Sequence, residues 1–594
     1  MAYIANWAST GYLSFLRGCA LLLSVGGLTA CSQETTSPSV SVAGNAALQA
    51  HSAEFERSIV EVVPGIHVAV GYALANVIMI EGDDGVIIVD TTESLAAARE
   101  VKAEFDRITT KPVKAIIYTH NHTDHIFGAQ AFAASGDVPV YAHASTWGHI
   151  ERIMNVLRPV IEPRSFHMFG NYLEAGGESI INDGIGPALA HSTSGDDDIY
   201  GLLPPTHTFE QQLELTIAGR RLVLMHAPGE TDDQILVWLP EDRVLLPGDN
   251  VYKAFPNLYT IRGTQYRDVM QWAASLRLMR SLGAEHLVPS HTRPVSGAEE
   301  VDDILQVYGD AIQFVHDQTV RGMNLGLDAD TLAHTVQLPA ELAGHPWLQP
   351  FYGTVPWSVR AIYNGYLGWY DGNSSTLFPT PSGTRAQRLL ALAGGEAAVL
   401  AEAQAQLTGD PQWAAELADL VLGASRDSVP VAAELKARAL RKLAGNTANP
   451  NARNWYLTDA LELEDRITTG PSPISAERVA FASGFPIAGV LRTMAVSLDP
   501  ARAAGIDQRV VFVFPDQGVQ YAIHVRHQVA VIEALPVVPD DASLVVTVQA
   551  TQWLALMAGQ RSFPLALADG TVQVSGGLGD TATLLRFLGL FRQE

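Results

Sequence analysis

Cysteine is nearly absent from this chain of 594 residues, which contains two, Cys19 and Cys31. Both lie near the N-terminus, away from the rest of the sequence. If processing removes Cys19 and a lipid modifies Cys31, no free thiol is left in the folded protein. This composition then excludes a disulfide framework and a zinc site built from thiolates.

Basic residues are also scarce, because 38 lysines and arginines stand against 63 aspartates and glutamates, for a net charge of −25. A nucleic-acid partner would need a basic face, so this balance argues against one. An anionic substrate would have to be attracted by local arginines and metal ions, because the net negative charge of the protein repels it. Hydrophobic residues make up 47% and charged residues 17%, as in folded globular proteins, and the length predicts two to four domains.

The apolar run near the N-terminus, Cys19–Leu28, is too short to cross a bilayer as a stable helix. Arg17 precedes it, and it ends in Leu-Thr-Ala-Cys at residues 28–31. This pattern resembles a bacterial lipoprotein signal, with cleavage before Cys31 and lipid on its sulfur; an ordinary secretory signal and a retained anchor are the alternatives. We therefore expect a signal peptide at 1–30, a tether at 31–50, and a periplasmic or cell-surface protein that is lipid-anchored at Cys31.

Three histidines and one aspartate fall within six residues, at His120, His122, Asp124 and His125. They directly follow the apolar run Val113–Ile117, which predicts a short buried strand, so they are expected on the loop at its end. Neutral imidazole and carboxylate are the ligands that suit zinc and neighbouring metals. The alternative is a solvated histidine-rich loop, but a random chain rarely produces this spacing.

The pattern H-x-H-x-D-H after a strand resembles the metallo-β-lactamase superfamily, whose fold is an αββα sandwich around one or two metal ions. Residues 257–263, Asn-Leu-Tyr-Thr-Ile-Arg-Gly, resemble the signature of its alkyl sulfatase branch almost residue for residue. Residues 164–173 resemble the substrate-covering insertion of that branch. The resemblance runs, unevenly, over most of the chain after the tether.

This resemblance implies further metal ligands at later strand ends. Glu230 follows Pro-Gly where most relatives carry histidine, and the doubt about its register leaves His226 as the substitute ligand. Asp249 could bridge two cations, since a carboxylate offers two oxygens, and His291 follows another predicted strand. The implied sites for two Zn²⁺ ions are His120, His122 and Glu230 for one, and Asp124, His125 and His291 for the other, with Asp249 between them. Such a pair lowers the pKa of a shared water towards neutrality.

Asp124 and Arg262 are the candidate catalytic residues. A planar guanidinium suits a tetrahedral oxyanion through paired donors, so Arg262 is assigned to the sulfate group, with Asn257 as a second donor. A structural ion pair is the alternative for Arg262. Tyr172 is a further candidate for substrate binding, and His167 is a weaker one.

The remaining pattern predicts an α/β (α+β) multidomain chain. Residues 51–383 are expected to form the metallo-β-lactamase-like sandwich, with residues 158–206 irregular. Residues 384–470 are expected to form helices at Leu389–Leu407, Trp413–Ala424 and Val431–Ala444. They resemble the family's helical dimerisation domain, which implies a homodimer. Residues 471–594 resemble a sterol carrier protein-like α+β domain, whose apolar groove could hold an alkyl chain.

The function that follows from the resemblance is zinc-dependent hydrolysis of alkyl sulfate esters to an alcohol and inorganic sulfate. Another hydrolase on the same fold, acting on a β-lactam or another ester, is one alternative, because a fold does not fix the chemistry. A lipoprotein that binds amphiphiles without catalysis is another alternative, although the complete candidate ligand set argues against it.

Overall fold

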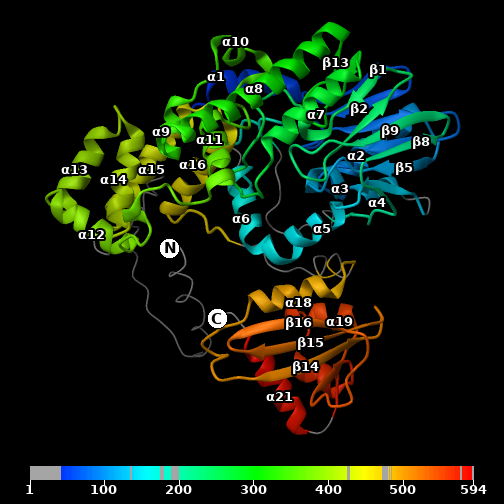
Figure 1. The fold of residues 1–594 in the computed structure, drawn as a ribbon, viewed down its shortest axis with the longest axis vertical. Coiled ribbons are helices and arrows are strands. Elements are labelled where there is room, and N and C mark those ends of the chain that lie inside the picture. The colour runs from blue at the N-terminus through cyan, green and yellow to red at the C-terminus, as the bar shows by residue number, and fades with distance from the viewer. Residues whose placement is uncertain are drawn as a thin grey trace, which may run out of the picture.

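The structure is a computed structural model that describes residues 42–133, 137–173, 179–188, 200–424, 429–470, 479, 482, 484–575 and 578–591. The predicted signal peptide and most of the predicted tether, including Cys31, lie outside these residues, so both stay predictions. The described chain forms a sandwich of sheets and helices, a helical part and a separate C-terminal part (Figure 1). Within the described ranges, no helix is long and apolar enough to cross a membrane.

Two mixed sheets form the centre of the sandwich. Among the described residues, the first sheet has seven strands in sequence order, antiparallel from β1 to β4 and parallel from β4 to β7. The second has six strands in the order β13-β12-β11-β10-β9-β8, in which β11 and β12 are parallel. The strands are β1 Ser58–Val63, β2 Ile66–Val70, β3 Val77–Glu81, β4 Val86–Val89, β5 Val113–Ile117, β6 Val140–His143, β7 His207–Phe209, β8 Gln212–Ile217, β9 Arg220–His226, β10 Ile235–Leu239, β11 Val244–Leu246, β12 His286–Leu287 and β13 Val295–Ser296.

Successive side chains of a strand point to opposite sides of its sheet. In the central strands of both sheets, the side chains on both sides are buried. On β3, Ile78 and Ile80 pack between the two sheets, whereas Val77 and Met79 pack under the outer helices. Helices α2 (Leu95–Ile108) and α4 (Ala129–Phe132) cover the first sheet, and α7 (Val269–Ser281), α8 (Ala298–Asn324) and α11 (Val355–Leu367) cover the second. The expected αββα sandwich is therefore confirmed.

The segment expected to be irregular, 158–206, contains a helix, so that expectation was wrong for its first part. Helix α5 (Thr146–Glu151) continues through a π-helical segment, η2 (Arg152–Leu157), into α6 (Arg158–Met168). Pro159 stands in the first turn of α6, where the helix already continues from η2, so its missing N–H removes a helical hydrogen bond. Pro163 lies inside the helix, which shows that tertiary packing outweighs the loss of one helical hydrogen bond here.

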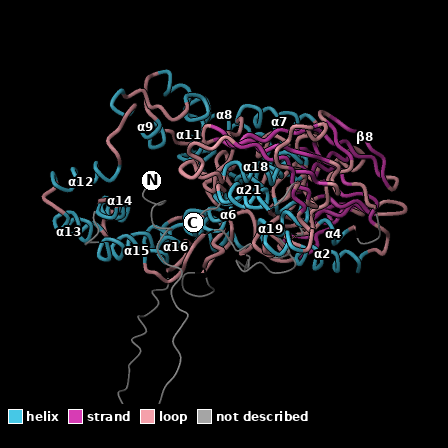
Figure 2. Tube along the Cα trace, turned by 90° about the horizontal axis from the view of Figure 1, so that it is seen from below, coloured by secondary structure: helices cyan, strands magenta, loops and turns pink. Residues whose placement is uncertain are grey.

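The helical part contains α12 to α16, which occupy one end of the molecule (Figure 2). The single helix expected at Leu389–Leu407 was wrong, because the chain breaks at Gly394 and Gly395, whose φ angles are 89° and 95°. Positive φ favours glycine and ends a helix. The helices are α12 Ser382–Leu392, α13 Glu396–Gln406, α14 Pro411–Leu422, α15 Val429–Asn446 and α16 Pro450–Leu463, preceded by α9 Ala329–Thr335 and α10 Ala340–Ala343.

The C-terminal part is a five-stranded sheet, β16-β15-β14-β17-β18 within the described residues, with its own apolar core. Its helix α18 lies against η2 of the sandwich (Figure 1). At Gly489 the approach is so close that a Cβ atom would lie 2.2 Å from Nδ2 of Asn155. The elements are α18 Ile487–Val496, β14 Gln508–Phe514, β15 Val519–Arg526, β16 Val529–Leu535, β17 Val545–Thr547, α19 Ala550–Met557, α20 Phe563–Ala568, β18 Gln573–Val574 and α21 Leu578–Gly589.

Candidate metal centre

The histidine-rich loop leaves the end of β5, as the sequence predicts. His122 is the N-cap of the short helix α3 (Thr123–Ile126), so Asp124 and His125 follow within its first turn. His120 and His125 are fully buried, and Asp124 is 8% exposed. The loop therefore turns its ligands into the protein and not towards solvent, which excludes the solvated-loop alternative.

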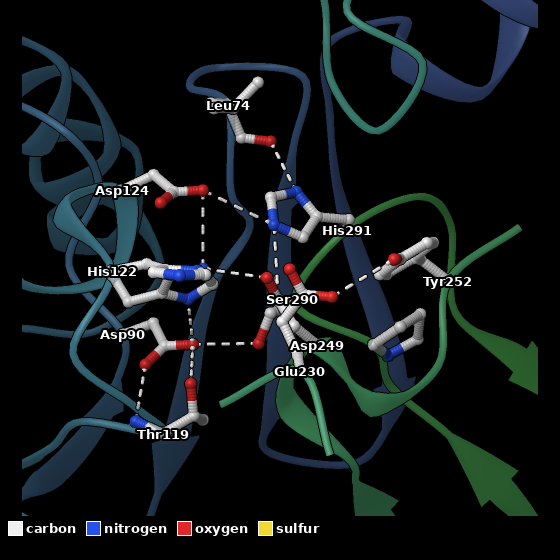
Figure 3. A network of polar contacts seen from close by, with 12 residues as sticks. Leu74, Asp90, Thr119, His122, Asp124, Glu230, Asp249, Tyr252, Ser290 and His291 are labelled. Atoms are coloured by element: carbon white, nitrogen blue, oxygen red, sulfur yellow. Dashed lines mark hydrogen bonds and ion pairs between the residues drawn. The ribbon is translucent and has the colours of Figure 1, made fainter. Parts of the chain in front are cut away.

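The later ligands come from the second sheet and meet this loop (Figure 3). Glu230 lies in the turn between β9 and β10, Asp249 in the 3₁₀ turn Gly248–Asn250 after β11, and His291 shortly after β12. All three are buried. The ends of strands from both sheets thus converge on one point.

Around this loop, the described residues form three groups in which each residue offers one ligand atom and these atoms lie within 4.8 Å of one another. The groups are His120, His125 and Asp249; Asp124, His125 and His291; and His122, Glu230 and Asp249. Asp249 belongs to two groups, as expected of a carboxylate that lies between two cations. The structure therefore gathers all seven residues that the sequence pointed to.

The spacing of the ligand atoms around His125 and His291 fits metal coordination better than hydrogen bonding. Nε2 of His125 lies 3.4 Å from Oδ2 of Asp124 and 3.4 Å from Oδ2 of Asp249. Nε2 of His291 lies 3.4 Å from Oδ2 of Asp124 and 3.2 Å from Oδ1 of Asp249. Four ligands about 2.0–2.1 Å from a tetrahedral zinc ion are roughly 3.3 Å apart.

Unpaired polar atoms provide a second test of this fit. Within the described chain, Nε2 of His125, Nε2 of His291 and Oδ1 of Asp249 are buried and have no hydrogen-bond partner. Buried polar atoms without partners are rare and costly, so they indicate a missing ion or ligand. Because Nδ1 of His291 donates to the carbonyl oxygen of Leu74 at 2.9 Å, its Nε2 carries a lone pair in the neutral ring. The residues present therefore fit a group of divalent metal ions.

Asp90, which the sequence did not single out, holds the ligand rings in place. Its Oδ2 accepts hydrogen bonds from Nδ1 of His125 at 2.7 Å, from Ser290 Oγ at 2.8 Å and from Thr119 Oγ1 at 3.0 Å. Because the Thr119 hydroxyl donates to Asp90, it accepts from Nδ1 of His120, 3.0 Å away. In the neutral form of each ring, Nδ1 therefore carries the proton and the unprotonated Nε2 faces the cluster, as metal-binding histidines require.

Glu230 has a cationic partner that sequence reasoning also missed. Its Oε1 lies 2.7 Å from Nη1 of Arg267, both side chains are 2% exposed, and its Oε2 accepts from the Tyr252 hydroxyl at 3.3 Å. Burial raises the pKa of Glu230 to about 7, although Arg267 opposes that shift. Burial, followed by the charges of His120 and Arg262, holds the pKa of His122 well below its usual value. That imidazole is therefore neutral, the form that binds metal.

Arg262 lies beside the cluster, at the wall of a cavity of about 300 Å³. Its Nη2 is 3.1 Å from Nε2 of His122. The cavity is also lined by Glu230 and Arg267 on its polar side and by apolar residues of η2 and α6, namely Ile153, Leu157 and Ile161. A cationic end next to the ligand cluster and an apolar side suit an amphiphilic anion.

The weaker candidates have different surroundings. Asn257 is 1% exposed and neither atom of its amide has a partner among the described residues. The hydroxyl of Tyr172 donates to the carbonyl oxygen of Gly470, and His167 faces Asp459 and Glu462 of α16. His226 stacks on His143 and contacts the Asp232 carbonyl oxygen, outside the metal groups. Glu230 is therefore the ligand candidate that the geometry favours over His226.

This fold and this ligand cluster define a protein of the metallo-β-lactamase superfamily, and the model of that superfamily matches residues 71–291. Two further family models match, alkyl sulfatase dimerisation at residues 328–466 and alkyl sulfatase C-terminal at residues 478–594. The order of the three matches follows the sandwich, the helical part and the C-terminal sheet.

Whole-length relatives identify the family. The chain is 39% identical over 533 residues to a linear primary-alkylsulfatase of Pseudomonas sp., covering 87% of this chain and 98% of that protein. It is 29% identical over 546 residues to an (R)-specific secondary-alkylsulfatase of Pseudomonas sp., covering 89% and 80%. A solved stereoselective inverting sec-alkylsulfatase from Pseudomonas sp. superposes with a TM-score of 0.84 at 27% identity, covering 93% and 87%. The chain belongs to the alkyl sulfatase family.

Proposed function

We propose that this protein hydrolyses alkyl sulfate esters to an alcohol and inorganic sulfate with two Zn²⁺ ions. The observation that carries the proposal is the cavity that has Arg262 and the ligand cluster at one end and aliphatic side chains along its side. An alkyl sulfate has the matching division, with an anionic head and an apolar chain. A β-lactam has no alkyl chain to match the aliphatic side. The amphiphile-binding alternative shares the match, but the cluster of seven candidate metal ligands argues against it.

As the family resemblance implies, His120, His122 and Glu230 would hold one ion, Asp124, His125 and His291 the other, and Asp249 would contact both. The grouping of Asp124 with His125 and His291, and of His122 with Glu230 and Asp249, supports this assignment. Metal ions there would supply Lewis-acid polarisation and a nucleophile at neutral pH. Burial raises the pKa of Asp124, but the charges of His125 and His291 lower it more, to about 2. Asp124 is thus a carboxylate at neutral pH, suited to binding a cation.

Arg262 acts on the sulfate head. A guanidinium remains charged and presents several N–H donors in one plane, so it binds an oxyanion and stabilises charge that develops on it. Its position 3.1 Å from His122, a candidate metal ligand, supports binding of the anion next to the cluster. The apolar residues of η2 and α6 exclude water from the alkyl chain and orient the ester.

Release of inorganic sulfate from dodecyl sulfate tests the proposal. The metal-loaded protein should release sulfate, lose this activity on chelation and show no turnover of nitrocefin. Absence of release over a range of alkyl sulfates, with metal bound, would overturn the proposal. Turnover of nitrocefin alone would favour the β-lactam hydrolase, and alkyl-chain binding that a His122→Ala variant leaves intact, without turnover, would favour the amphiphile-binding protein.

The family supports a homodimer formed through the helical part, since the dimerisation model matches residues 328–466. We further propose that the protein is exported and carries a lipid on Cys31, for which the Leu-Thr-Ala-Cys pattern is the support. Metabolic labelling with palmitate in a bacterial host tests this. Label in the wild type that disappears in Cys31→Ser would support the anchor, and an unlabelled wild type would refute it.

A further inference from the structure

Helix α6 contacts the loop that carries Arg262. The guanidinium of Arg164 donates from Nε to the carbonyl oxygen of Arg262 at 2.8 Å and from Nη2 to that of Ile261 at 2.5 Å. Two charge-assisted hydrogen bonds from one rigid group fix both the place and the orientation of a backbone segment. The substrate-facing arginine is thus held by a second arginine through its main chain.

The loop has further support from the same helix. Thr260 Oγ1 donates to Sδ of Met168 at 3.2 Å, one turn of α6 beyond Arg164. The N–H of Gly263 donates to the Thr260 carbonyl oxygen at 3.0 Å and closes a turn, and the φ of Gly263 is +106°. Arg262 is therefore the third residue of a tight turn that α6 holds at its first residue and at the carbonyl oxygens of its two central residues.

On its other side, α6 rests on α16 of the helical part. The Arg164 guanidinium lies over the ring of Trp455, with 5.2 Å between its carbon and the ring centroid. Nδ2 of Asn454 donates to the carbonyl oxygen of Met168 at 3.2 Å. Nε2 of His167 lies 3.6 Å from Asp459 and 3.7 Å from Glu462, which are one turn apart on α16. One turn of α6 is thus joined to more than two turns of α16.

From these contacts we infer that Arg164 is a positioning residue for Arg262 and that Trp455 of the helical part holds Arg164 in place. The inference rests on the proposed function, because it takes Arg262 as the group that binds the sulfate head. It assigns the helical part a role in building the anion-binding end of the cavity, in addition to its role in dimerisation.

The ring of Trp455 packs against the guanidinium that bonds to both loop carbonyl oxygens, and so limits where that guanidinium can lie. Arg164→Gln removes the charge and all but one donor group, whereas Arg164→Lys keeps the charge but cannot bind both carbonyl oxygens in the same planar geometry. Trp455→Ala removes the cation–π contact, which Trp455→Phe retains in part. Misplacement of Arg262 by a fraction of an ångström weakens its bonds to the anion.

The test compares these four variants with Arg158→Gln as the matched control. Arg158 lies on the same helix, but its side chain bonds to Glu162 and Tyr200, away from the loop. For each protein we would measure metal content, the binding constant of inorganic sulfate by calorimetry, and KM and kcat with dodecyl sulfate.

Arg164→Gln and Trp455→Ala should weaken sulfate binding and raise KM about tenfold, with metal content unchanged. Arg164→Lys and Trp455→Phe should recover part of the loss, and Arg158→Gln should match the wild type. Wild-type sulfate affinity in Arg164→Gln, or an equal loss in Arg158→Gln, would overturn the inference. Sulfate binding reports on the inference and dodecyl sulfate turnover on the function, so a protein that binds sulfate but turns over no alkyl sulfate would refute the function alone.

Discussion

Nη2 of Arg262 lies 3.1 Å from Nε2 of His122. An arginine can only donate, so the imidazole nitrogen is the acceptor, and a metal ion bound to that nitrogen would take the place of this hydrogen bond. His122 is a ligand candidate from the first half of the sandwich, and Arg262 lies on a loop from the second half. The anion-binding arginine and the metal-binding residues are therefore direct neighbours, and variants of single residues can distinguish their roles.

Replacement of Arg262 should affect the substrate more than the metal. Arg262→Gln removes the charged donor, and hydrogen bonds to charged groups contribute about 1.5–3 kcal/mol, so kcat/KM should fall roughly 10- to 150-fold. Steady-state kinetics with dodecyl sulfate measure this fall, and elemental analysis should find the wild-type metal content. Loss of metal in this variant would show that Arg262 supports the ligands and not the substrate.

The choice between Glu230 and His226 can be tested by a matched pair of variants. Glu230→Gln keeps the size of the side chain but removes a metal-binding carboxylate, so the protein should bind about one metal ion per chain in place of two. His226→Gln should keep both ions, because its ring contacts His143 and the Asp232 carbonyl oxygen only. The opposite result from elemental analysis would make His226 the ligand.

Asp90 should affect metal affinity although it is not itself a candidate ligand. Asp90→Asn replaces the oxygen that accepts from His125, Thr119 and Ser290, so at least one of these donors loses its acceptor. Loss of such a supporting group costs 10- to 100-fold in metal affinity or activity. Competition with a chelating dye measures the affinity. Ser290→Ala, which leaves the two ligand rings bonded, is the control and should lose clearly less.

Removal of metal should lower stability as well as activity. The carboxylates of Asp124 and Asp249 would then share a buried site without a cation between them, although His125 and His291 lie close by. A ligand present at a thousand times its Kd stabilises a protein by about 4 kcal/mol, so dialysis against a chelator should lower Tm clearly, and added Zn²⁺ should restore it. An unchanged Tm after proven metal loss would contradict a structural contribution of the site.

The contact between His167 and Glu462 predicts a dependence of stability on pH. Burial lowers the pKa of His167, but the bond to Glu462 and neighbouring charges raise it by more, so the pKa lies above 6.5. Burial raises the pKa of Glu462, but the bonds to His167 and Thr469 lower it by more, so it lies below 4.5. The contribution of His167 to the free energy of unfolding is therefore fully present below pH 6.5 and is lost as the pH rises through the folded pKa. The contribution of Glu462 is present above pH 4.5 and is lost as the pH falls through its folded pKa.

The stabilising effect of this contact should thus be greater near pH 5.5 than near pH 9. Comparison of Tm for the wild type and His167→Gln at both pH values measures it. The wild type should exceed the variant by a larger margin at pH 5.5. A margin that grows towards pH 9 would show that His167 is neutral in the folded protein.

The metal loop could be predicted because its four residues are neighbours in sequence and follow a recognisable strand. Glu230, Asp249 and His291 needed the family resemblance, since each is a single residue in an ordinary turn. Asp90 and Arg267 gave no local signal. Asp90 bonds to residues up to 200 positions away, and the role of Arg267 depends on two loops meeting in the fold.

The two errors in predicted secondary structure have different physical causes. Helix α6 contains prolines that favour irregular structure locally, but its contacts with α16 and with the loop of Arg262 stabilise the helix. By contrast, the break at Gly394 and Gly395 was present in the sequence, since a Gly-Gly pair is a strong helix terminator. Local sequence therefore decided one case, and long-range packing decided the other.

The start of the described chain is tied to the helical part. Nη2 of Arg453 donates to the carbonyl oxygen of Val42 at 3.1 Å, and Nδ2 of Asn45 donates to that of Asn446. Ten residues separate Cys31 from Val42, which can span at most about 36 Å. An enzyme anchored at Cys31 would therefore hold its helical part next to the bilayer, where detergents and fatty amphiphiles concentrate, and both subunits of a dimer would be restrained at the same face.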